Sequence, residues 1–472
     1  MPEAPRQTVA RRHPGVGMPH AAVAELTFPA LTVEPISRML ALQFQFERSE
    51  WWPPERLAEE QYAQLALVLA HAFETTPYYR TLFTRAGVRR PAKVDAGFLR
   101  TLPITKRADI QTAGRGLVSQ RHPKEHGPMT FARTSGSTGQ PVDFGRDNLT
   151  NLMWLACSLR EYLWHGRDFR GKIASIRQMK PGEADAPDGA RTAQWGSSVA
   201  SAFPTGPGVL LDVASSLDDQ IAWLRREQPG QLISLPSNLV ALAAHAQARG
   251  EPLPPIGEIR TFGEMLPADS RATLRQAWRG KVTDMYTCEE AGYLALQCPE
   301  HDHFHVMAEN VIIEIVDEAG QACEVGVPGR VLVTSLHNFG TPLIRYDIGD
   351  YAEFGPPCPC GRGLPVIRQV HGRRRNRVVL PDGRTGFPRL GERTFVTTPG
   401  LRIAQFKCVQ KSLAAVELQL VCEPRPDAAQ QAEIARVLTA SLGHPFAVSF
   451  SFPERILPGP NGKFETFVSE VS

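Results

Sequence analysis

Small and hydroxylated residues are concentrated at positions 133–141, which read Arg-Thr-Ser-Gly-Ser-Thr-Gly-Gln-Pro. Glycine lets successive backbone N–H groups turn inward into an anion-binding nest, and Ser and Thr hydroxyls add further donors. The composition predicts a loop that wraps a polyphosphate. The residues that would line it are Ser135, Gly136, Ser137, Thr138 and Gly139. It is not a Walker loop, because Gln140 and Pro141 follow where lysine and Ser/Thr are required, and an ordinary turn is the alternative.

Two short cysteine-containing segments form a candidate metal site. Positions 298–301 read Cys-Pro-Glu-His, the spacing of a zinc knuckle, and positions 358–361 read Cys-Pro-Cys-Gly. Four soft or borderline ligands suit a closed, structural, tetrahedral Zn²⁺. The predicted ligands are Cys298, His301, Cys358 and Cys360. His303 and His305 compete with His301 for the fourth position, and four unrelated packing residues are the alternative.

Two later segments extend the pattern, at 341–350 (TPLIRYDIGD) and 460–464 (PNGKF). Together with the stretch at 133–141, they resemble the phenylacetate–CoA ligase branch of the adenylate-forming superfamily. That superfamily includes acyl–CoA synthetases, peptide-synthetase adenylation domains and luciferases. The resemblance covers nearly the whole chain, from residues 76–80 and 102–106 through 403–406 to the C-terminus. It implies ATP-dependent activation of an acid as an acyl-adenylate, with release of pyrophosphate.

The resemblance assigns roles to individual residues. Asp350 would accept hydrogen bonds from the ribose hydroxyls, Tyr286 would stack on adenine and Glu290 would bind Mg²⁺. The other implied nucleotide-site residues are Gly263, Glu264 and Arg373, and the implied hinge residue is Arg375. Two positions depart from the pattern: relatives commonly carry Ser or Thr at Glu289, and Asp or Lys at Arg375. Either Glu289 turns away from the phosphates, or metal and phosphate binding is altered.

Lys463 is the predicted catalytic residue. Attack of a carboxylate on the α-phosphate builds negative charge on the phosphate oxygens and on the departing pyrophosphate, which a mobile ammonium group neutralises. A solvated lysine in a turn is the alternative. The predicted acid pocket consists of Ala202, Phe203, Pro236, Ser237 and Phe262, although Ser237 is equally well explained as a helix N-cap.

The resemblance makes coenzyme A the expected acceptor of the acyl group and an aromatic or compact acid the expected substrate. A separate carrier protein or an amine is an alternative acceptor. A binding protein that has lost turnover is the rival class, and a homodimer is expected from the family alone.

Bulk composition agrees with such an enzyme. The chain has 472 residues, 42% of them hydrophobic, and a formal net charge of +3. This balance gives no electrostatic reason to expect nucleic acid or a membrane as partner. No apolar run has the length of a membrane span, and no signal peptide is evident, so we expect a cytoplasmic protein. The eight cysteines are expected to be mostly reduced thiols.

Local patterns predict the elements that hold these residues. Apolar residues recur with helical spacing over 56–73, and Ser237 and Asp269 precede two further helical patterns as candidate caps. Residues 311–316 and 331–336 predict a β-hairpin, while 416–421 and 447–452 predict strands around a helix at 428–441. We therefore expect an α/β protein: a mobile arm at 1–35, a large adenylation domain of sheets and flanking helices at 36–372, and a small mobile α+β domain at 373–472.

Overall fold

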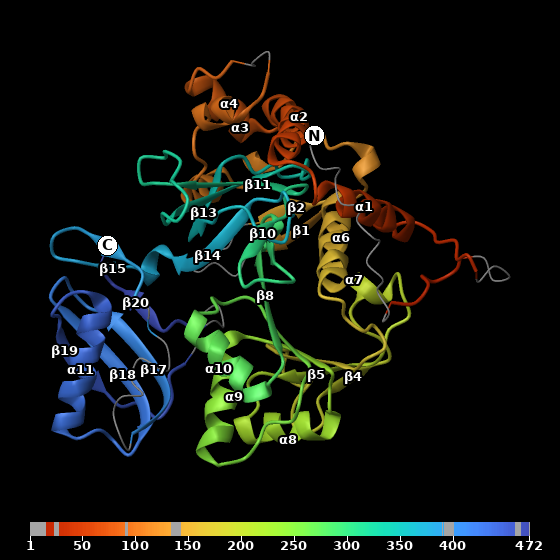
Figure 1. The fold of residues 1–472 in the computed structure, drawn as a ribbon. Coiled ribbons are helices and arrows are strands. Elements are labelled where there is room, and N and C mark those ends of the chain that lie inside the picture. Colours follow the sequence, from red (N-terminus) through yellow and green to blue (C-terminus); the bar gives the residue numbers. More distant parts are fainter. Residues whose placement is uncertain are drawn as a thin grey trace, which may run out of the picture.

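The computed structural model describes residues 16–22, 28–89, 93–133, 143–388, 390, 401–457 and 464–471. Helices dominate its N-terminal part (Figure 1). They are α1 (Ile36–Ser49), α2 (Pro54–Thr75), α3 (Pro77–Arg85), α4 (Ala96–Thr101) and α5 (Arg107–Ala113), followed by the 3₁₀ turns η1 (Gly114–Leu117) and η2 (Lys124–His126). The helix expected over 56–73 is confirmed as α2, whose Leu65 and Val68 are fully buried. Between η2 and α6 (Asn148–Trp164), β1 (Thr130–Arg133) and β2 (Asp143–Arg146) pair antiparallel.

A twelve-stranded sheet runs through the centre of the molecule in the order β11-β12-β13-β14-β10-β9-β8-β7-β6-β3-β5-β4. Its first half in sequence contains β3 (Ile173–Arg177), β4 (Ala190–Thr192), β5 (Gly208–Asp212), β6 (Gln231–Ser234) and β7 (Glu258–Thr261). Its second half contains β8 (Lys281–Cys288), β9 (Gly292–Gln297), β10 (Phe304–Val306), β11 (Val311–Val316), β12 (Gly329–Ser335), β13 (Tyr346–Phe354) and β14 (Val366–Arg373). The hairpin expected from 311–316 and 331–336 is confirmed as β11 and β12.

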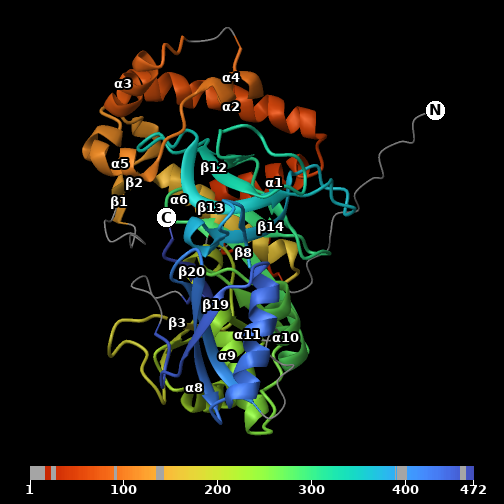
Figure 2. The same ribbon diagram turned by 90° about the vertical axis from the view of Figure 1, so that its left-hand side faces the viewer.

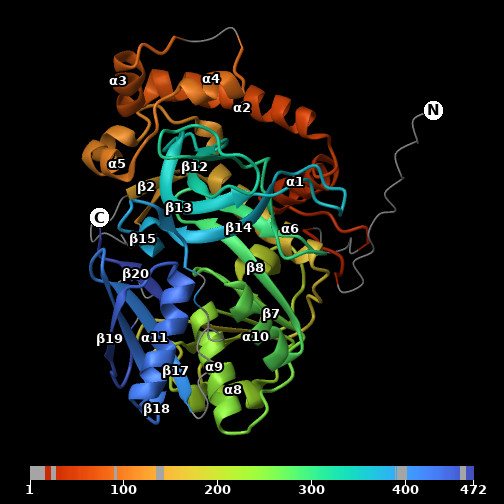
Figure 3. The same ribbon diagram turned by 60° about the vertical axis from the view of Figure 1, so that its left-hand side comes forward.

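Strand β8 joins the two halves of this sheet. Its first four residues pair parallel with β7, and its last four pair antiparallel with β9. Helices α8 (Leu217–Glu227), α9 (Pro236–Ala248) and α10 (Ala268–Trp278) lie beside the parallel half, whereas α6 lies near the antiparallel half, with the short α7 (Ser197–Ala200) below it (Figures 1 and 3). Tyr286 follows the change of pairing and therefore lies where the two halves meet.

A second, four-stranded sheet follows β14 and η3 (Arg374–Asn376). Its order is β19-β18-β17-β20, formed by β17 (Arg402–Gln410), β18 (Ala415–Glu423), β19 (Ala447–Ser451) and β20 (Phe467–Ser469), with α11 (Ala428–Leu442) beside it. The short pair β15 (Val378–Val379) and β16 (Thr385–Gly386) precedes it. The expected strand–helix–strand pattern is confirmed, and this part of the chain lies beside α9 and α10 (Figures 1 and 2). The expected α/β fold is likewise confirmed.

Ser237 and Asp269 are not N-caps. Helices α9 and α10 begin at Pro236 and Ala268, one residue before each of these positions, and their caps are Leu235 and Pro267. Part of the expected arm is described, and there the backbone N–H of His20 donates to the carbonyl of Ala202 at 2.9 Å. No helix in the described parts of the chain is long and apolar enough to cross a membrane.

Candidate functional site

Strand register brings three of the predicted nucleotide residues together. Asp350 on β13 lies directly opposite Arg373 on β14. The Tyr286 hydroxyl donates to Oδ2 of Asp350 at 3.0 Å, and Nε of Arg373 lies 3.5 Å from Oδ1. Burial, reinforced by the charge of Asp350, raises the pKa of Tyr286 well above its usual value, so its phenol remains a neutral donor. A carboxylate held between two donors on rigid strands is a preformed acceptor for a diol.

The predicted Mg²⁺ ligand Glu290 follows β8 on the turn into β9. Its Oε1 lies 3.3 Å from Nη1 of Arg107, the first residue of α5. Burial raises the pKa of Glu290, and the guanidinium opposes this effect by favouring the charged form. One or two carboxylates with phosphate oxygens are the usual Mg²⁺ setting in nucleotide sites, so this donor suits the ion.

Its neighbour Glu289 points to a different arginine. Nη2 of Arg146 donates to Oε2 of Glu289 at 2.9 Å and also to the Glu289 carbonyl. The Glu289 side chain keeps 65% of its surface exposed. The carboxylate of Glu289 is therefore engaged by Arg146, and that of Glu290 by Arg107.

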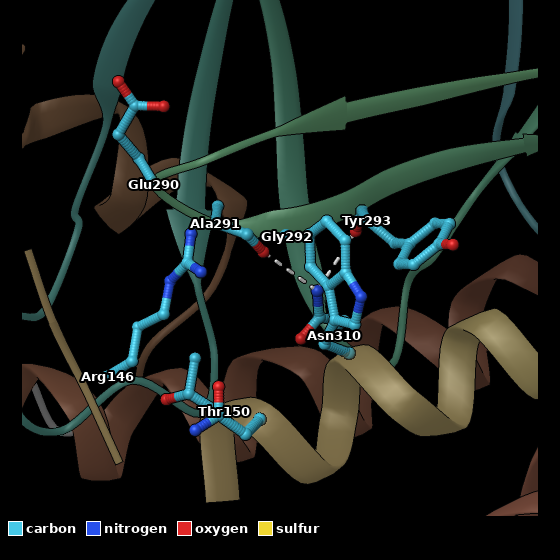
Figure 4. A pocket seen from close by; sticks show the side chains of 9 residues that line it. Arg146, Thr150, Glu290, Ala291, Gly292, Tyr293 and Asn310 are labelled. Atoms are coloured by element: carbon cyan, nitrogen blue, oxygen red, sulfur yellow. Dashed lines mark hydrogen bonds between the residues drawn. The ribbon is translucent and has the colours of Figure 1, made fainter. Parts of the chain in front are cut away.

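A small cavity of about 30 Å³ adjoins Glu290, lined by residues of α6, the β8–β9 turn and Asn310 (Figure 4). Nδ2 of Asn310 donates to the carbonyls of Ala291 and Tyr293, at 3.3 and 3.1 Å, and so fixes the backbone after Glu290. The cavity has room for ordered water beside Glu290.

Glu264 was expected only as part of the backbone that lines the nucleotide and acyl pockets, yet its side chain joins two distant segments. Its Oε2 accepts the backbone N–H of Ser237 at 3.0 Å, and its Oε1 accepts that of Phe464 at 2.7 Å. Gly263 before it has a φ of +78°, a conformation that favours glycine. The sequence carries no signal for this contact, because 200 residues separate Glu264 from Phe464.

The segment around the predicted hinge is also bound to the C-terminus. Nη2 of Arg375 lies 2.8 Å from Oε2 of Glu465. Nδ2 of Asn376 donates to Oε1 of the same carboxylate at 3.0 Å and to the carbonyl of Phe467 at 2.8 Å. These contacts fix the residues that follow Lys463. Lys463 and the loop residues Ser135, Gly136, Ser137, Thr138 and Gly139 lie outside the described residues.

The predicted acid-pocket residues occupy different environments. Ala202 and Phe203 are buried in one hydrophobic cluster, where the Phe203 ring lies 5.5 Å from that of Phe169. Pro236 is the first residue of α9 and is buried, and Ser237 follows it with its backbone held by Glu264. Phe262 is half-buried directly after β7. The structure thus ties Ser237 to Glu264.

The cysteine segments converge, but the grouped ligands contain His303 and His305 in place of the predicted His301 and Cys360. Ligand atoms of Cys298, His303, His305 and Cys358 all lie within 4.8 Å of one another, and His303 Nε2 lies 2.9 Å from Cys358 Sγ. Cys360 Sγ lies 3.4 Å from His305 Nε2. The preference for His301 is not supported. Among the described residues, His301 does not belong to this group of ligand atoms, and its ring stacks on that of His303.

This donor set fits zinc. Burial lowers the pKa of His305 to about 3, which keeps its imidazole in the neutral form that binds metals. Tetrahedral Zn²⁺ with sulfur and nitrogen ligands separates neighbouring ligand atoms by roughly 3.3–3.8 Å. The 3.8 Å between the sulfurs of Cys298 and Cys358 agrees with that spacing, whereas the 2.9 Å between His303 Nε2 and Cys358 Sγ is shorter.

The sequence of this chain is similar to those of known proteins. No protein-family model matches the chain. A Bacillus subtilis protein described as an uncharacterized acyl–CoA ligase is 28% identical over 245 residues, covering 49% of this chain and 46% of that relative, about half its length. A phenylacetate–coenzyme A ligase of Thermus thermophilus is 24% identical over 342 residues, covering 70% of this chain and 73% of the relative.

A solved structure shares the fold. The crystal structure of a 2-hydroxyisobutyryl–CoA ligase in the postadenylation state gives a TM-score of 0.70 at 17% identity, covering 90% of this chain and 92% of that one. The same enzyme in the thioesterification state gives a TM-score of 0.57. The chain therefore has the fold of the adenylate-forming acyl–CoA ligases, and its relatives confirm the sequence resemblance to the phenylacetate–CoA ligase branch.

Proposed function

We propose that this chain is an AMP-forming ligase that activates a carboxylic acid with ATP and transfers the acyl group to coenzyme A. In the first step a carboxylate oxygen attacks the α-phosphorus, and the bond to pyrophosphate breaks. In the second step the thiol sulfur attacks the acyl carbon, the bond to AMP breaks and the thiol proton is released. The observation that carries the proposal is the preformed acceptor Asp350 between Tyr286 and Arg373.

Each end of the nucleotide is assigned to its own residues. Asp350 and Arg373 bind the ribose, Tyr286 and the backbone at Gly263 and Glu264 line the adenine side, and the loop at 135–139 binds the phosphates. Glu290 holds Mg²⁺, which would neutralise phosphate charge when bound. The buried position of Glu290 supports this role, since electrostatic interactions are stronger where water is excluded.

Lys463 supplies the mobile cation for the adenylation step. Two contacts support a defined position for its segment: Glu264 accepts from the Phe464 backbone at 2.7 Å, and Glu465 pairs with Arg375 at 2.8 Å. Both flank Lys463 on its C-terminal side. Arg375 serves as the hinge in this proposal, and release of its ion pair would accompany the change from adenylation to thioester formation.

The relative named as a phenylacetate–coenzyme A ligase supports coenzyme A as acceptor and an aromatic or compact acid as substrate. A separate carrier protein or an amine as acceptor, a homodimer and a cytoplasmic location remain predictions from the sequence. A non-catalytic nucleotide- or zinc-binding protein is the alternative function.

The first test is acid-dependent release of pyrophosphate from ATP and Mg²⁺ across a panel of aromatic and short-chain acids. We expect Lys463→Ala to lower the rate by about 10²–10³, the effect of removing one transition-state donor. Lys411→Ala is the matched control, since Lys411 is a surface lysine paired with Glu470 in the same small domain. Absence of acid-dependent release in the native chain would favour the non-catalytic alternative. Coenzyme A, hydroxylamine and amines added afterwards identify the acceptor.

A structural zinc site is the second part of the proposal, with Cys298, His303 and Cys358 as ligands and His305 or Cys360 completing the set. The ion would fasten the β9–β10 turn to the loop before β14. We expect a strong chelator to lower the Tm of the native chain by several degrees and to leave that of Cys298→Ser unchanged, because the variant has already lost the metal. Cys323→Ser is the control, as this thiol lies away from the cluster. An equal response of all three proteins would contradict zinc at this site.

A further inference from the structure

A second cluster of metal-ligand residues lies apart from the cysteines. His122 and His126 come from the segment around η2, and Asp147 from the residue before α6. Their ligand atoms all lie within 4.8 Å of one another. Oδ2 of Asp147 is 2.9 Å from Nε2 of His122 and 3.5 Å from Nδ1 of His126.

The two carboxylate oxygens of Asp147 have different tasks. Oδ1 caps α6 by accepting the backbone N–H and the hydroxyl of Thr150, both at 2.7 Å. Oδ2 faces the two imidazoles, and the Asp147 side chain is 0% exposed. A fully buried carboxylate is costly unless it is paired or coordinates a cation. The cap thus orients the carboxylate so that its second oxygen is presented to His122 and His126.

One imidazole nitrogen of this cluster makes no hydrogen bond with the described residues. The described part of the chain offers the buried Nδ1 of His126 no hydrogen-bond partner. The His126 ring is held by an edge-to-face contact with Phe339, at 4.9 Å between centroids. Two further histidines in this region are engaged elsewhere: Nε2 of His71 lies 2.9 Å from the carbonyl of Phe339, and Nε2 of His337 lies 2.7 Å from that of Glu309.

A simple histidine–aspartate pair elsewhere in the chain provides a contrast. Nε2 of His245 lies 2.8 Å from Oδ1 of Asp218, but this carboxylate is 64% exposed and lies outside both potential metal-binding groups among the described residues. Hydrogen bonding alone explains that pair. At Asp147 a second imidazole approaches the same buried oxygen to 3.5 Å without forming a hydrogen bond, so two rings converge on one carboxylate oxygen that hydrogen-bonds only one of them.

We propose that His122, His126 and Asp147 form a binding site for a divalent transition-metal ion such as Zn²⁺ or Co²⁺. Two imidazoles and one carboxylate are a donor set that such ions favour, and three protein ligands leave positions open to solvent. The ion joins the segment that holds η2 to the first turn of α6. Arg146 precedes Asp147 and binds Glu289, so the site lies one residue away from an arginine of the candidate active site.

The test is metal binding by the full chain, freed of metal and titrated with Co²⁺. Cobalt bound to thiolates gives ligand-to-metal charge-transfer bands in the near ultraviolet, whereas cobalt at an imidazole and carboxylate site gives only weak visible bands. We expect the native chain to bind one equivalent without charge-transfer absorption. His126→Ala should lower the affinity for that equivalent at least about 100-fold, more than the loss of an outer-shell partner costs. His245→Ala is the matched control and should bind as the native chain does.

Two results would overturn the proposal. The first is that the native chain and the His122→Ala/His126→Ala double variant bind this equivalent of Co²⁺ equally well. The second is that all cobalt bound by the native chain shows thiolate bands. Asp147 is left intact, because it also caps α6 and its replacement would destabilise that helix. A second measurement guards against misfolding: added Zn²⁺ should raise the Tm of the Cys298→Ser chain, and this increase should disappear when His126→Gln is combined with it.

Discussion

The two ends of the candidate nucleotide site are built differently. At the ribose end, Tyr286, Asp350 and Arg373 lie on strands of one sheet, and two of them face each other in register. At the carboxylate end, Glu289 and Glu290 lie on the turn after β8, and each pairs with an arginine from outside the sheet. The ribose end is fixed by backbone pairing, whereas the carboxylate end depends on side-chain ion pairs.

This difference has a physical consequence. Strand register cannot change without moving whole rows of side chains, so Asp350 keeps its position before any ligand arrives. An ion pair can exchange one partner for another when a stronger cation enters. Under the proposed function, Mg²⁺ would replace Arg107 as the partner of the Glu290 carboxylate. The ribose end is preorganised, and the carboxylate end is set for exchange.

The largest expected effect tests this exchange. Glu290→Gln removes the charge that would bind Mg²⁺, and we expect the adenylation rate to fall by about 10²–10³. The concentration of Mg²⁺ required for half-maximal rate should rise as well, because an amide is a weaker ligand for a hard cation. Pyrophosphate release measured across a series of Mg²⁺ concentrations checks both effects. An unchanged Mg²⁺ requirement would mean that Glu290 serves only to anchor Arg107.

A smaller effect is expected at the ribose end. Asp350→Asn keeps the shape but removes the charge, and charge-assisted hydrogen bonds are roughly twice as strong as neutral ones. We expect the KM for ATP to rise about 10- to 100-fold while the Mg²⁺ requirement stays constant. Glu318→Gln is the matched control, since Glu318 accepts from the Tyr351 hydroxyl at 2.7 Å in a similar tyrosine–carboxylate pair. A rise in the Mg²⁺ requirement of Asp350→Asn would erase the distinction between the two ends.

The sequence named Tyr286, Asp350 and Arg373 from contiguous motifs, and the structure brings these three residues into contact. The segment at 341–350 ends in Asp350, and the hairpin patterns around it predicted strands that the structure contains. Tyr286 and Arg373 were named from short motifs on β8 and β14, two strands of the same sheet. A motif carried on a strand has its geometry set by the strand, so residues named from such motifs can be placed in the fold from the sequence.

Contacts between distant segments were not predictable in this way. Glu264 was placed with the pocket backbone, yet its carboxylate binds Ser237 and Phe464, and no local pattern encodes a contact across 200 residues. The choice of His301 failed for a related reason. Zinc-knuckle spacing favoured it, but His301 precedes β10 and stacks on His303, whereas His303 and His305 both lie in the cluster with Cys298 and Cys358. Sequence spacing does not show which of three nearby histidines converge on Cys358, because that depends on the path of the turn before β10.

The smallest expected effect concerns Glu289, the departure from the family pattern. Its carboxylate is largely exposed and accepts a hydrogen bond from Arg146 at 2.9 Å. Glu290 binds a different arginine, Arg107. Exposed ion pairs contribute at most about 1 kcal/mol, so Glu289→Gln should change the adenylation rate by less than about fivefold. Its Mg²⁺ requirement should equal that of the native chain when measured beside Glu290→Gln. Two adjacent glutamates of equal charge would then differ by orders of magnitude, because one is buried against α5 and the other is held at the surface by β2. A Mg²⁺ requirement that changes equally in both variants would instead show that the carboxylates act as a pair, and that Arg146 does not hold Glu289 away from the metal.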